Sequence, residues 1–355
     1  MEENNFDIEQ LIGRRVSLDI SDDALNALRG KFIAVTGAAG SIGSGICRQL
    51  MRLCDLSGML LIDNAETPMH ELRLELSGKA PKNTHFIIAD IRDKRRIDSL
   101  FSQYRPEIVF HAAAYKHVPL MEENPYEAAF VNVIGTKNVA DAAAANGCEI
   151  FLLASTDKAV EATGILGVTK RIAERYIQSR KSATKFITVR FGNVTDSNGS
   201  VLPLFRQQIS NGGPVTVTDS RMTRYFMTIP EACRLIIEAC ALCEGNDTFL
   251  FDMGEPVSIM ELAKKMIALS GRNDIQIVET GIRPGEKLTE RLLNDGETTE
   301  KTSHPRIMRV LSQKTSQELG DSMLIAIASS IESCDEKKIS ETLKWNSLKK
   351  PIPEE

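Results

Sequence analysis

The feature that most constrains the fold is the glycine-rich turn VTGAAGSIGSGI, in which Gly37, Gly40 and Gly43 follow a short apolar run. The run at 32–35 has the composition of a buried strand. After the turn, apolar residues recur every three or four positions, which predicts one buried face of a helix. A strand, a glycine turn and a helix in this order predict the first βαβ unit of a dinucleotide-binding fold.

A steric argument explains why glycine is needed in this turn. A Cβ would block the tight turn, or would keep the pyrophosphate of a dinucleotide away from the backbone N–H groups at the positive end of the helix. A set of glycines that only shapes a turn is the alternative. We expect the dinucleotide to contact Gly37, Gly40, Ser41, Ile42 and Gly43.

Further apolar runs follow the first, separated by stretches of helical spacing. Near-continuous apolar strands that alternate with helices predict a parallel sheet covered on both faces. The expected fold class is therefore α/β, a Rossmann-type doubly wound parallel sheet with a smaller C-terminal substrate-binding lobe. The expected strands lie at 32–35, 60–62, 86–88, 108–110, 150–153 and 186–189.

The texture of the sequence changes after Arg190, where loops rich in Gly, Asn and Pro replace the regular alternation. Helical patterns return near 230–244 and 258–270, so this region predicts a capping lobe interleaved with late elements of the sheet. The expected divisions are an N-terminal arm at 1–30, a Rossmann domain at 31–192 with late elements around 225–252, an interleaved substrate-binding lobe at 193–325 and a tail at 326–355.

Bulk properties argue against several classes of protein. A net charge of −5 offers no general attraction to nucleic acid, so no such partner is expected. No apolar run approaches the roughly 20 residues that span a bilayer, and the start MEENNFDIEQ lacks the regions of a signal peptide. We therefore expect a cytoplasmic chain with no membrane insertion. The five histidines and seven cysteines show no ligand spacing, so no metal is expected.

Acidic and small residues at the ends of later strands extend the dinucleotide site. Asp63 ends the second strand, where a carboxylate can accept hydrogen bonds from a ribose and would repel the extra phosphate of NADP, so the expected cofactor is NAD. A helix cap is the alternative for Asp63, and a plain loop aspartate for Asp90. The other expected cofactor contacts are Asp90 near the adenine, Ile91 beside it, and Ala112, Ala113 and Ala114 after the fourth strand.

Thr156, Asp157 and Lys158 directly follow the fifth expected strand. The carboxyl ends of parallel strands face the crevice in which α/β proteins bind ligands. A carboxyl group and an amine side by side at that edge could act as an acid and a base next to a nicotinamide. A simple ion pair or a loop cap is the alternative.

Four segments carry a resemblance to a known family: HAAAYKHVPLMEENP (111–125), STDKAV (155–160), GVTKR (167–171) and MTRYFMTIPEA (222–232). They resemble the extended short-chain dehydrogenase/reductase superfamily. More narrowly, they resemble the CapD-like polysaccharide-biosynthesis family of UDP-N-acetylglucosamine 4,6-dehydratases. The form expected here is short and soluble, without the membrane anchor of longer members.

The resemblance implies a reaction and assigns roles. It implies a hydro-lyase that turns UDP-N-acetylglucosamine into a UDP-4-keto-6-deoxy-N-acetylhexosamine for a bacterial surface glycan, with tightly bound NAD regenerated in each turnover. Asp157 would be the acid for the departing C6 hydroxyl, Lys158 the base for the C5 proton, and Thr156 the hydroxyl near the C4 oxygen. Lys170 would hold the cofactor ribose, and a plain helix-surface lysine is its alternative.

Leu166 departs from the superfamily pattern. It lies one helical turn before Lys170, where the superfamily usually carries a tyrosine that removes the C4 hydroxyl proton. Leucine cannot exchange a proton, although some similar dehydratases carry methionine here. The group that takes the first proton is therefore open between Thr156, a water and another group. The loop EATGIL also lacks the Asn-Pro pair expected in relatives.

A UDP group requires Arg side chains for its phosphates and amide donors for its base. The resemblance places such residues near the fourth strand, after the sixth strand, and in the MTRYFMT and RPGEK segments. Taken singly, each of these residues is more often solvated or structural. The expected substrate contacts are Lys116, His117, Asn193, Arg221, Arg224, Arg283 and Glu286.

Two other functions fit the same patterns. A UDP-sugar epimerase or 5,6-dehydratase would pass through the same oxidised sugar, and a non-catalytic NAD-binding sensor would explain the missing tyrosine. The trio at 156–158 argues against a sensor, which has no need of an acid and a base at that strand end. The expected partners are a UDP-sugar substrate and further copies of the chain in a homo-oligomer.

Overall fold

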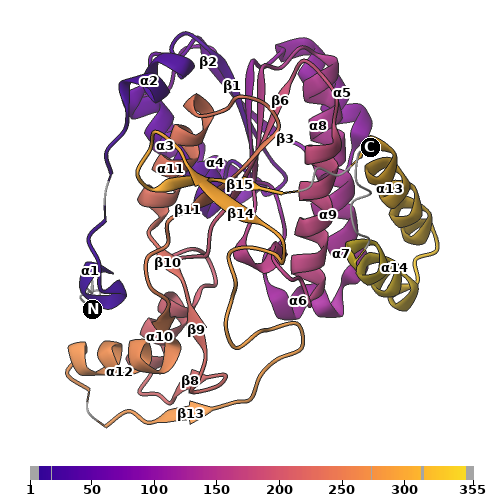
Figure 1. Cartoon of the computed structure of the whole chain (residues 1–355). Coiled ribbons are helices and arrows are strands. Elements are labelled where there is room, and N and C mark those ends of the chain that lie inside the picture. The colour runs from indigo at the N-terminus through magenta and orange to yellow at the C-terminus, as the bar shows by residue number, and fades with distance from the viewer. Residues whose placement is uncertain (1–7, 17, 273, 313–315, 349–355) are drawn as a thin grey trace.

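The computed structural model describes residues 8–16, 18–272, 274–312 and 316–348, and its centre is a nine-stranded sheet (Figure 1). The strand order is β14-β15-β11-β6-β5-β4-β1-β2-β3. All neighbours are parallel except the pairs that β15 makes with β11 and β14. These strands are β1 Phe32–Thr36, β2 Gly58–Asp63, β3 Thr84–Ile88, β4 Ile108–His111, β5 Ile150–Ala154, β6 Lys185–Arg190, β11 Asp247–Phe251, β14 Thr298–Lys301 and β15 Ile307–Leu311.

Two hydrophobic clusters cover the two faces of this sheet. Successive residues of β1 alternate between them, with Phe32 and Ala34 in one cluster and Ile33 and Val35 in the other, because neighbouring side chains of a strand point to opposite faces. Burial on both faces explains why the strands are continuous apolar runs in the sequence. The six expected strands and the Rossmann-type α/β fold class are confirmed.

Helices form a layer on each side of the sheet, to its right and left in Figure 1. One layer contains α5 Lys94–Tyr104, α6 Val118–Glu123, α7 Pro125–Ala129 with a π-helical turn Phe130–Gly135, α8 Thr136–Ala145, α9 Ile165–Ser179, α13 Gln317–Glu332 and α14 Glu336–Leu348. The other contains α2 Asp22–Leu28, α3 Ser41–Leu53, α4 Glu66–Leu76 and α11 Ile229–Ala241. The strand order reverses at β1, which pairs with β2 on one side and β4 on the other, so the ends of β1 and β4 open the crevice in which such sheets bind ligands.

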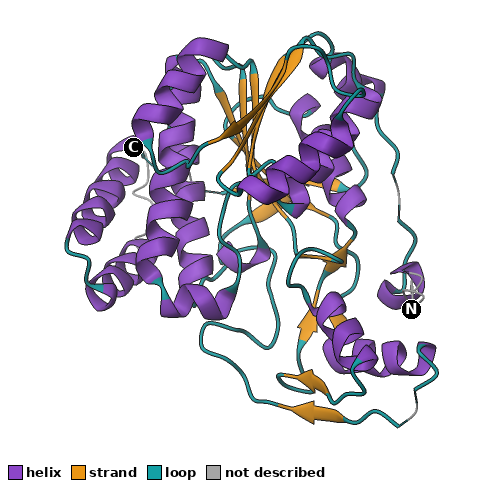
Figure 2. Cartoon of the chain, turned by 180° about the vertical axis from the view of Figure 1, so that it is seen from behind, coloured by secondary structure: helices purple, strands orange, loops and turns teal. Residues whose placement is uncertain are grey.

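A smaller lobe with its own hydrophobic cluster lies below the sheet in Figures 1 and 2. It is built from α10 Val201–Ser210, β8 Val215–Val217, α12 Ile259–Leu269 and β13 Ile277–Glu279, and α1 Ile8–Ile12 packs against it. Two short strand pairs lie between this lobe and the sheet (Figure 1). They are β7 Asn193–Val194 with β10 Phe226–Met227, and β9 Thr223–Arg224 with β12 Val257–Ser258.

The chain passes between sheet and lobe more than once. β11 lies among the late elements expected around 225–252, while β14 and β15 also join the sheet, and α13 spans the expected boundary at 325/326. The division of the chain into domains therefore stays a prediction. Residues 1–7 and 17 of the expected arm, and 349–355 of the expected tail, lie outside the described residues.

Two buried glutamates of α11 bind the expected N-terminal arm. Arg14 donates two hydrogen bonds to Glu231, which is fully buried and also completes the capping box at the start of α11. Ser21, the N-cap of α2, donates its N–H and its hydroxyl to Glu238. The described part of the N-terminal segment is thus attached to α11, a helix of the layer that covers the sheet.

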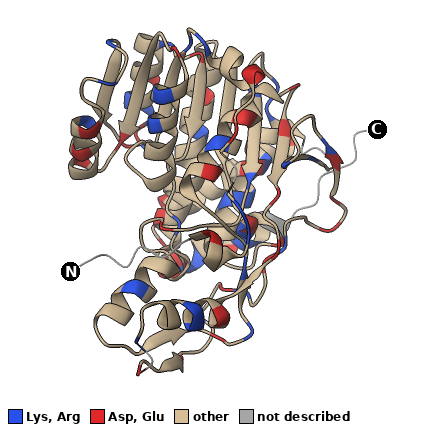
Figure 3. Cartoon of the chain, turned by 90° about the vertical axis from the view of Figure 1, so that its left-hand side faces the viewer, with Lys and Arg blue, Asp and Glu red and all other residues tan. Residues whose placement is uncertain are grey.

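Further properties of the described residues concern membranes, metals and thiols. None of the helices seen in these ranges combines the length and apolar character needed to cross a membrane. No cluster of three or more His, Cys, Asp or Glu within the same ranges is arranged to hold a metal ion. Lys and Arg are interspersed with Asp and Glu over the side shown in Figure 3. All seven cysteines are free thiols and five are buried, among them Cys240 and Cys243.

Candidate active site

The glycine turn between β1 and α3 has no room for side chains. Gly37 has a φ of +67°, and a Cβ on it would lie 2.6 Å from the backbone nitrogen of Ala113. A Cβ on Gly43 would lie 2.0 Å from the carbonyl oxygen of Gly37. Gly40 is the N-cap of α3, so the first N–H groups of that helix are open at the turn. The turn forms a cradle that fits a pyrophosphate.

The expected cofactor aspartates have backbone and arginine partners. Asp63 accepts hydrogen bonds from the N–H groups of Ala39, at 2.9 Å, and Ala65, at 3.0 Å, and so fastens the glycine turn to the end of β2. Asp90 is paired with Arg92 at 2.7 Å. Burial raises the pKa of Asp90, but the hydrogen bonds from Arg92 outweigh it and the net pKa is lowered.

The neighbouring cofactor candidates differ in their surroundings. Ala112, Ala113 and Ala114 are partly buried after β4, and Ala113 lies against the glycine cradle as expected. Ile91 is buried, and its side chain packs against Gly135 of the π-helical turn rather than against the cradle.

The acid–base turn, which we define as Thr156 to Ala159, follows β5 and forms a short 3₁₀ turn. Asp157 is 1% exposed, and its Oδ1 accepts hydrogen bonds from the Thr156 hydroxyl, at 2.9 Å, and from Lys158 Nζ, at 3.0 Å. Its Oδ2 has no hydrogen-bond partner among the described residues. Lys158 Nζ also donates to Asn193 Oδ1 at 2.8 Å. The structure thus brings four expected site residues together.

Lys170 lies on α9 behind this turn. It is buried, and its Nζ donates to the carbonyl oxygen of Ala154 at 2.7 Å. Burial lowers the pKa of Lys170 to about 8. Leu166, one helical turn earlier, is also buried.

His111, at the end of β4, lies in the core. Its ring bridges the hydroxyls of Thr36 and Thr136. His111 therefore has a structural place.

The depressed pKa of Lys170 predicts a pH-dependent stability that Lys170→Met removes. The folded state holds this lysine at about 8, against an ordinary value of 10.5, so the unfolded chain binds more protons between these values. The unfolding free energy therefore rises with pH across this window, by about 3 kcal/mol relative to the variant. Urea unfolding of both proteins without dinucleotide, in steps from neutral pH upward, measures it. A wild-type-minus-variant difference that is constant with pH would contradict the prediction.

The loop segment 283–290, in which the sequence singled out Arg283 and Glu286 but not Lys287 or Glu290, lies against the acid–base turn. Lys287 Nζ donates to the carbonyl oxygen of Val160 at 2.7 Å. Arg224, only 6% exposed, donates to the backbone carbonyl oxygens of residues 223, 287 and 288. Arg224 therefore shapes this segment, and its hydrogen bonds go to backbone atoms rather than to a free surface.

Glu290 on the same segment is a buried carboxylate beside the acid–base turn. Its Oε2 has no hydrogen-bond partner within the described ranges, and its residue is 8% exposed. Three cations surround it beyond hydrogen-bonding distance: Lys287 Nζ at 3.7 Å, Lys158 Nζ at 3.9 Å and Arg224 Nε at 4.0 Å. Burial raises the pKa of Glu290; the cations, Lys158 first, oppose this and the Asp157 carboxylate adds to it.

The remaining expected substrate residues lie farther out. Arg221 pairs with Asp219 at 2.8 Å with a side chain that is 70% exposed, and Arg283 is exposed. Glu286 is half-buried, and its Oε2 has no hydrogen-bond partner in the described part of the chain. Lys116 and His117 are exposed after β4, where the His117 ring lies against Gly199.

A buried ionic network lies behind the acid–base turn. Arg190 at the end of β6 donates to Glu174 of α9 and to Glu297, in each case at 2.7 Å. Ser155, directly before the turn, donates its hydroxyl to Glu174. The three charged side chains are at most 10% exposed. Through Glu297, this network connects β5, β6 and α9 to the loop region between β13 and β14, which also contains Glu290.

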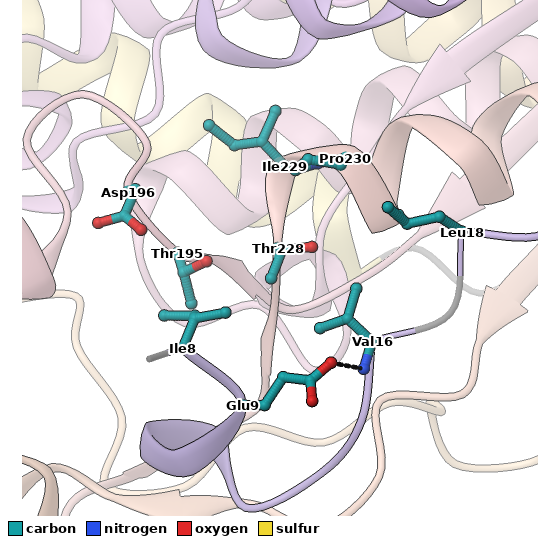
Figure 4. A pocket seen from close by; sticks show the side chains of 9 residues that line it. All are labelled: Ile8, Glu9, Val16, Leu18, Thr195, Asp196, Thr228, Ile229 and Pro230. Carbon is teal, nitrogen blue, oxygen red and sulfur yellow. Dashed lines mark hydrogen bonds between the residues drawn. The ribbon is translucent and has the colours of Figure 1, made fainter. Parts of the chain in front are cut away.

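Two hollows flank the site. The larger, about 330 Å³, lies between the N-terminal segment and the start of α11 and is lined by Ile8, Glu9, Val16, Leu18, Thr195, Asp196, Thr228, Ile229 and Pro230 (Figure 4). No residue of the acid–base turn lines it. The smaller, about 10 Å³, lies beside Lys158, Leu166 and Glu290.

Comparison with known proteins places this arrangement in a family. The family of polysaccharide biosynthesis proteins matches residues 33–312, which include the cradle, the acid–base turn and the segment with Glu290. The chain belongs to the polysaccharide biosynthesis protein family. This membership confirms the resemblance found in the sequence.

Two relatives named for polysaccharide biosynthesis are longer than this chain. The probable polysaccharide biosynthesis protein EpsC of Bacillus subtilis is 51% identical over 306 residues, which are 84% of this chain and 51% of that protein. The capsular polysaccharide biosynthesis protein CapD of Staphylococcus aureus is 48% identical over 320 residues, 87% of this chain and 53% of that protein. The chain spans about half the length of these relatives.

Solved structures share the fold of this family member. The structure of Pen from Bacillus thuringiensis is 34% identical with a TM-score of 0.76, and the match covers 82% of this chain and 92% of that one. The dTDP-glucose 4,6-dehydratase DesIV from Streptomyces venezuelae, with NAD bound, is 19% identical with a TM-score of 0.65, covering 74% and 88%. At that identity the likeness to DesIV concerns the fold alone.

Proposed function

We propose that the protein is an NAD-dependent 4,6-dehydratase that converts UDP-N-acetylglucosamine to a UDP-4-keto-6-deoxy-N-acetylhexosamine for polysaccharide synthesis. The observation that carries this proposal is the pair of buried Asp157 and partly exposed Lys158 at the carboxyl end of β5. The names of the EpsC and CapD relatives support the polysaccharide part, and DesIV shows that a dehydratase can use this fold.

The glycine cradle fits NAD. Side chains at Gly37 and Gly43 would fill the space that a pyrophosphate needs, and the open N–H groups of α3 can bind it. Asp63 lies at the end of β2, where it can reach a ribose hydroxyl and disfavours the additional phosphate of NADP. When bound, NAD supplies the oxidation of the sugar at C4 and the matching reduction at C6.

The residues of the acid–base turn move the protons of the elimination. Lys158 removes the C5 proton, made acidic by the C4 ketone, and Asp157 protonates the C6 hydroxyl as it departs. Asp157 Oδ2, buried and without a hydrogen-bond partner among the described residues, is the atom from which a proton can be given to a substrate. Thr156 and Asn193 orient the pair through their hydrogen bonds.

The nucleotide half of the substrate would lie on the outer residues. Arg221 and Arg283 are exposed and have the chemistry to bind a diphosphate, and Glu286 has a free carboxylate oxygen for a ribose. Lys116 and His117 would line the sugar side. Arg224 contributes indirectly, because it holds the backbone of the segment that carries Glu286.

Incubation of the purified protein with UDP-N-acetylglucosamine and related UDP-hexoses tests the function. We expect a product lighter by one water, with a new methyl group in its NMR spectrum and a C5 configuration that the same spectrum assigns. Asp157→Asn, of nearly equal shape, should bind NAD but form no such product. An unchanged mass with inverted C4 would identify an epimerase instead. No conversion of any UDP-sugar by the NAD-bound protein would rule out the proposal.

A further inference from the structure

The small cavity beside Leu166 is suited to one water molecule. Its volume is about 10 Å³, and Lys158, Lys287 and Glu290 form the charged part of its wall. A buried water needs a space of roughly this size and two to four polar partners. Leu166, which stands where the superfamily usually has its proton-accepting tyrosine, forms an apolar part of the same wall.

Lys287 has N–H groups left for such a water. Its ammonium group carries three N–H bonds and donates one of them to the carbonyl of Val160. The other two are available among the described contacts. Lys158, which must be a neutral amine to act as a base, uses both of its N–H bonds on Asp157 and Asn193.

Glu290 is the acceptor that this water would connect. Its Oε2 is buried and has no hydrogen bond to any described residue, a costly state for a carboxylate unless a partner is supplied. The cations around it lie 3.7 to 4.0 Å away, which is the kind of gap that a bridging water fills. Glu290 is also the one carboxylate that lines the cavity within the described part of the chain.

We propose that Glu290 accepts, through one water in this cavity, the proton that leaves the sugar C4 hydroxyl. This inference rests on the proposed function. The O–H bond at C4 breaks, the water takes that proton, and a proton of the water passes to Glu290 Oε2, which becomes a carboxylic acid. The C4 hydrogen and its electron pair go to the NAD of the proposed function.

The same assignment balances the protons over a turnover. Asp157 loses one proton to the departing C6 hydroxyl, and Glu290 has gained one from C4. Lys158 takes the C5 proton and gives it back to C5 when the hydride would return to C6, so it ends unchanged. Lys158 Nζ lies between them, 3.0 Å from Asp157 Oδ1 and 3.9 Å from Glu290 Oε1. Passing a proton from Glu290 through Lys158 to Asp157 returns the site to its starting charge.

The charges that face Glu290 set its pH dependence. Lys158 belongs to the acid–base turn, Arg224 to β9, and Lys287 to its own segment; all three favour the carboxylate, whereas burial and Asp157 favour the acid. A protonated Glu290 cannot accept a proton. The rate of sugar oxidation at C4 should therefore fall at low pH in the wild type. This fall should be absent in a variant without the carboxylate.

Glu290→Gln keeps the shape of the side chain and removes its capacity to accept a proton. The rate of nicotinamide reduction in a single turnover with UDP-N-acetylglucosamine, followed by absorbance, should fall by about 10²- to 10⁴-fold. Affinity for the UDP-sugar, measured by calorimetry, should stay unchanged. Glu300→Gln, on the exposed strand β14 where Glu300 pairs with Arg309, is the matched control and should behave as wild type.

Introducing a tyrosine at position 166 distinguishes proton transfer by Glu290 from a structural role of Glu290. Leu166→Tyr in the Glu290→Gln protein should recover most of the lost rate, whereas Leu166→Phe, which lacks the hydroxyl, should not. Reduction at the wild-type rate in Glu290→Gln, or equal rates with Tyr and Phe, would overturn the proposal.

A crystal structure of the wild-type protein gives a readout that does not depend on activity or on the folding of a variant. We expect an ordered water bonded to Glu290 Oε2 and to a lysine Nζ, and an empty or filled-in cavity would overturn the proposal. Loss of water from the sugar is measured first in the wild type. A failure of the proposed function therefore appears in the wild type, and a failure of this inference in the variants and the cavity.

Discussion

Lys158→Ala is expected to lower the rate at which the sugar C5 hydrogen exchanges with solvent by about 10²- to 10⁴-fold, the usual contribution of a positioned proton-transfer group. Asp157 and Asn193 hold Lys158 Nζ at 3.0 and 2.8 Å, so the amine is fixed in place beside the acid. NAD binding should persist, because the glycine cradle belongs to the turn between β1 and α3. NMR in deuterated water measures the exchange, and calorimetry measures NAD binding.

Two further variants make this experiment specific. Lys158→Met keeps most of the side-chain volume without the amine and should show the same loss. Lys264→Ala, on the exposed surface of α12, removes a lysine that pairs with its neighbour Glu261, far from the acid–base turn in the chain, and should exchange at the wild-type rate. Exchange that persists in both Lys158 variants would show that another group is the base.

Arg190→Met is expected to lower the unfolding free energy by about 3–5 kcal/mol. The guanidinium group is 3% exposed and is the shared partner of Glu174 and Glu297. Methionine can fill the space of the side-chain stem, but it leaves two buried carboxylates without their cation. Ser155 would then be the remaining side chain bonded to Glu174. Urea denaturation followed by circular dichroism measures the change.

Arg48→Met is the matched control for this prediction. Arg48 also binds a glutamate, Glu75, at 2.6 Å, but both side chains are more than 40% exposed. An exposed ion pair contributes at most about 1 kcal/mol, so the control should lose little. Equal losses in the two variants would show that burial of the Arg190 network adds nothing.

The parts of the fold that follow from local patterns could be predicted from the sequence. The six strands are confirmed. Five of them are largely buried and are therefore continuous apolar runs, whereas β3, at the edge of the sheet, is only partly buried. The glycine turn has a steric cause that acts within a few residues, as the clash between a Cβ on Gly43 and the carbonyl of Gly37 shows. Asp157 and Lys158 could be placed at the ligand-binding edge because they directly follow a parallel strand. Asn193, which was expected at the substrate, follows the neighbouring strand β6 and accepts a hydrogen bond from Lys158.

The parts that depend on distant contacts could not be predicted. Glu290 and Lys287 meet the acid–base turn from more than 120 residues away, and the RPGEK motif directed attention to Arg283 and Glu286 instead. Arg224 was expected at the substrate, yet its guanidinium group donates hydrogen bonds to backbone carbonyl oxygens. Such contacts cannot be predicted from the sequence, because every residue has a backbone carbonyl. The assignment of these residues to substrate binding stays a prediction.

The interleaving of the lobe with the sheet has a consequence for protein engineering. β6 precedes the lobe, β11 interrupts it, and β14 and β15 follow it, so the lobe is two separate stretches of chain, each anchored in the sheet at both ends. The lobe therefore cannot be transferred between proteins as one continuous segment. A chimaera that exchanges substrate preference between relatives must graft both stretches at once, because one graft alone would join two unmatched halves of the same hydrophobic cluster.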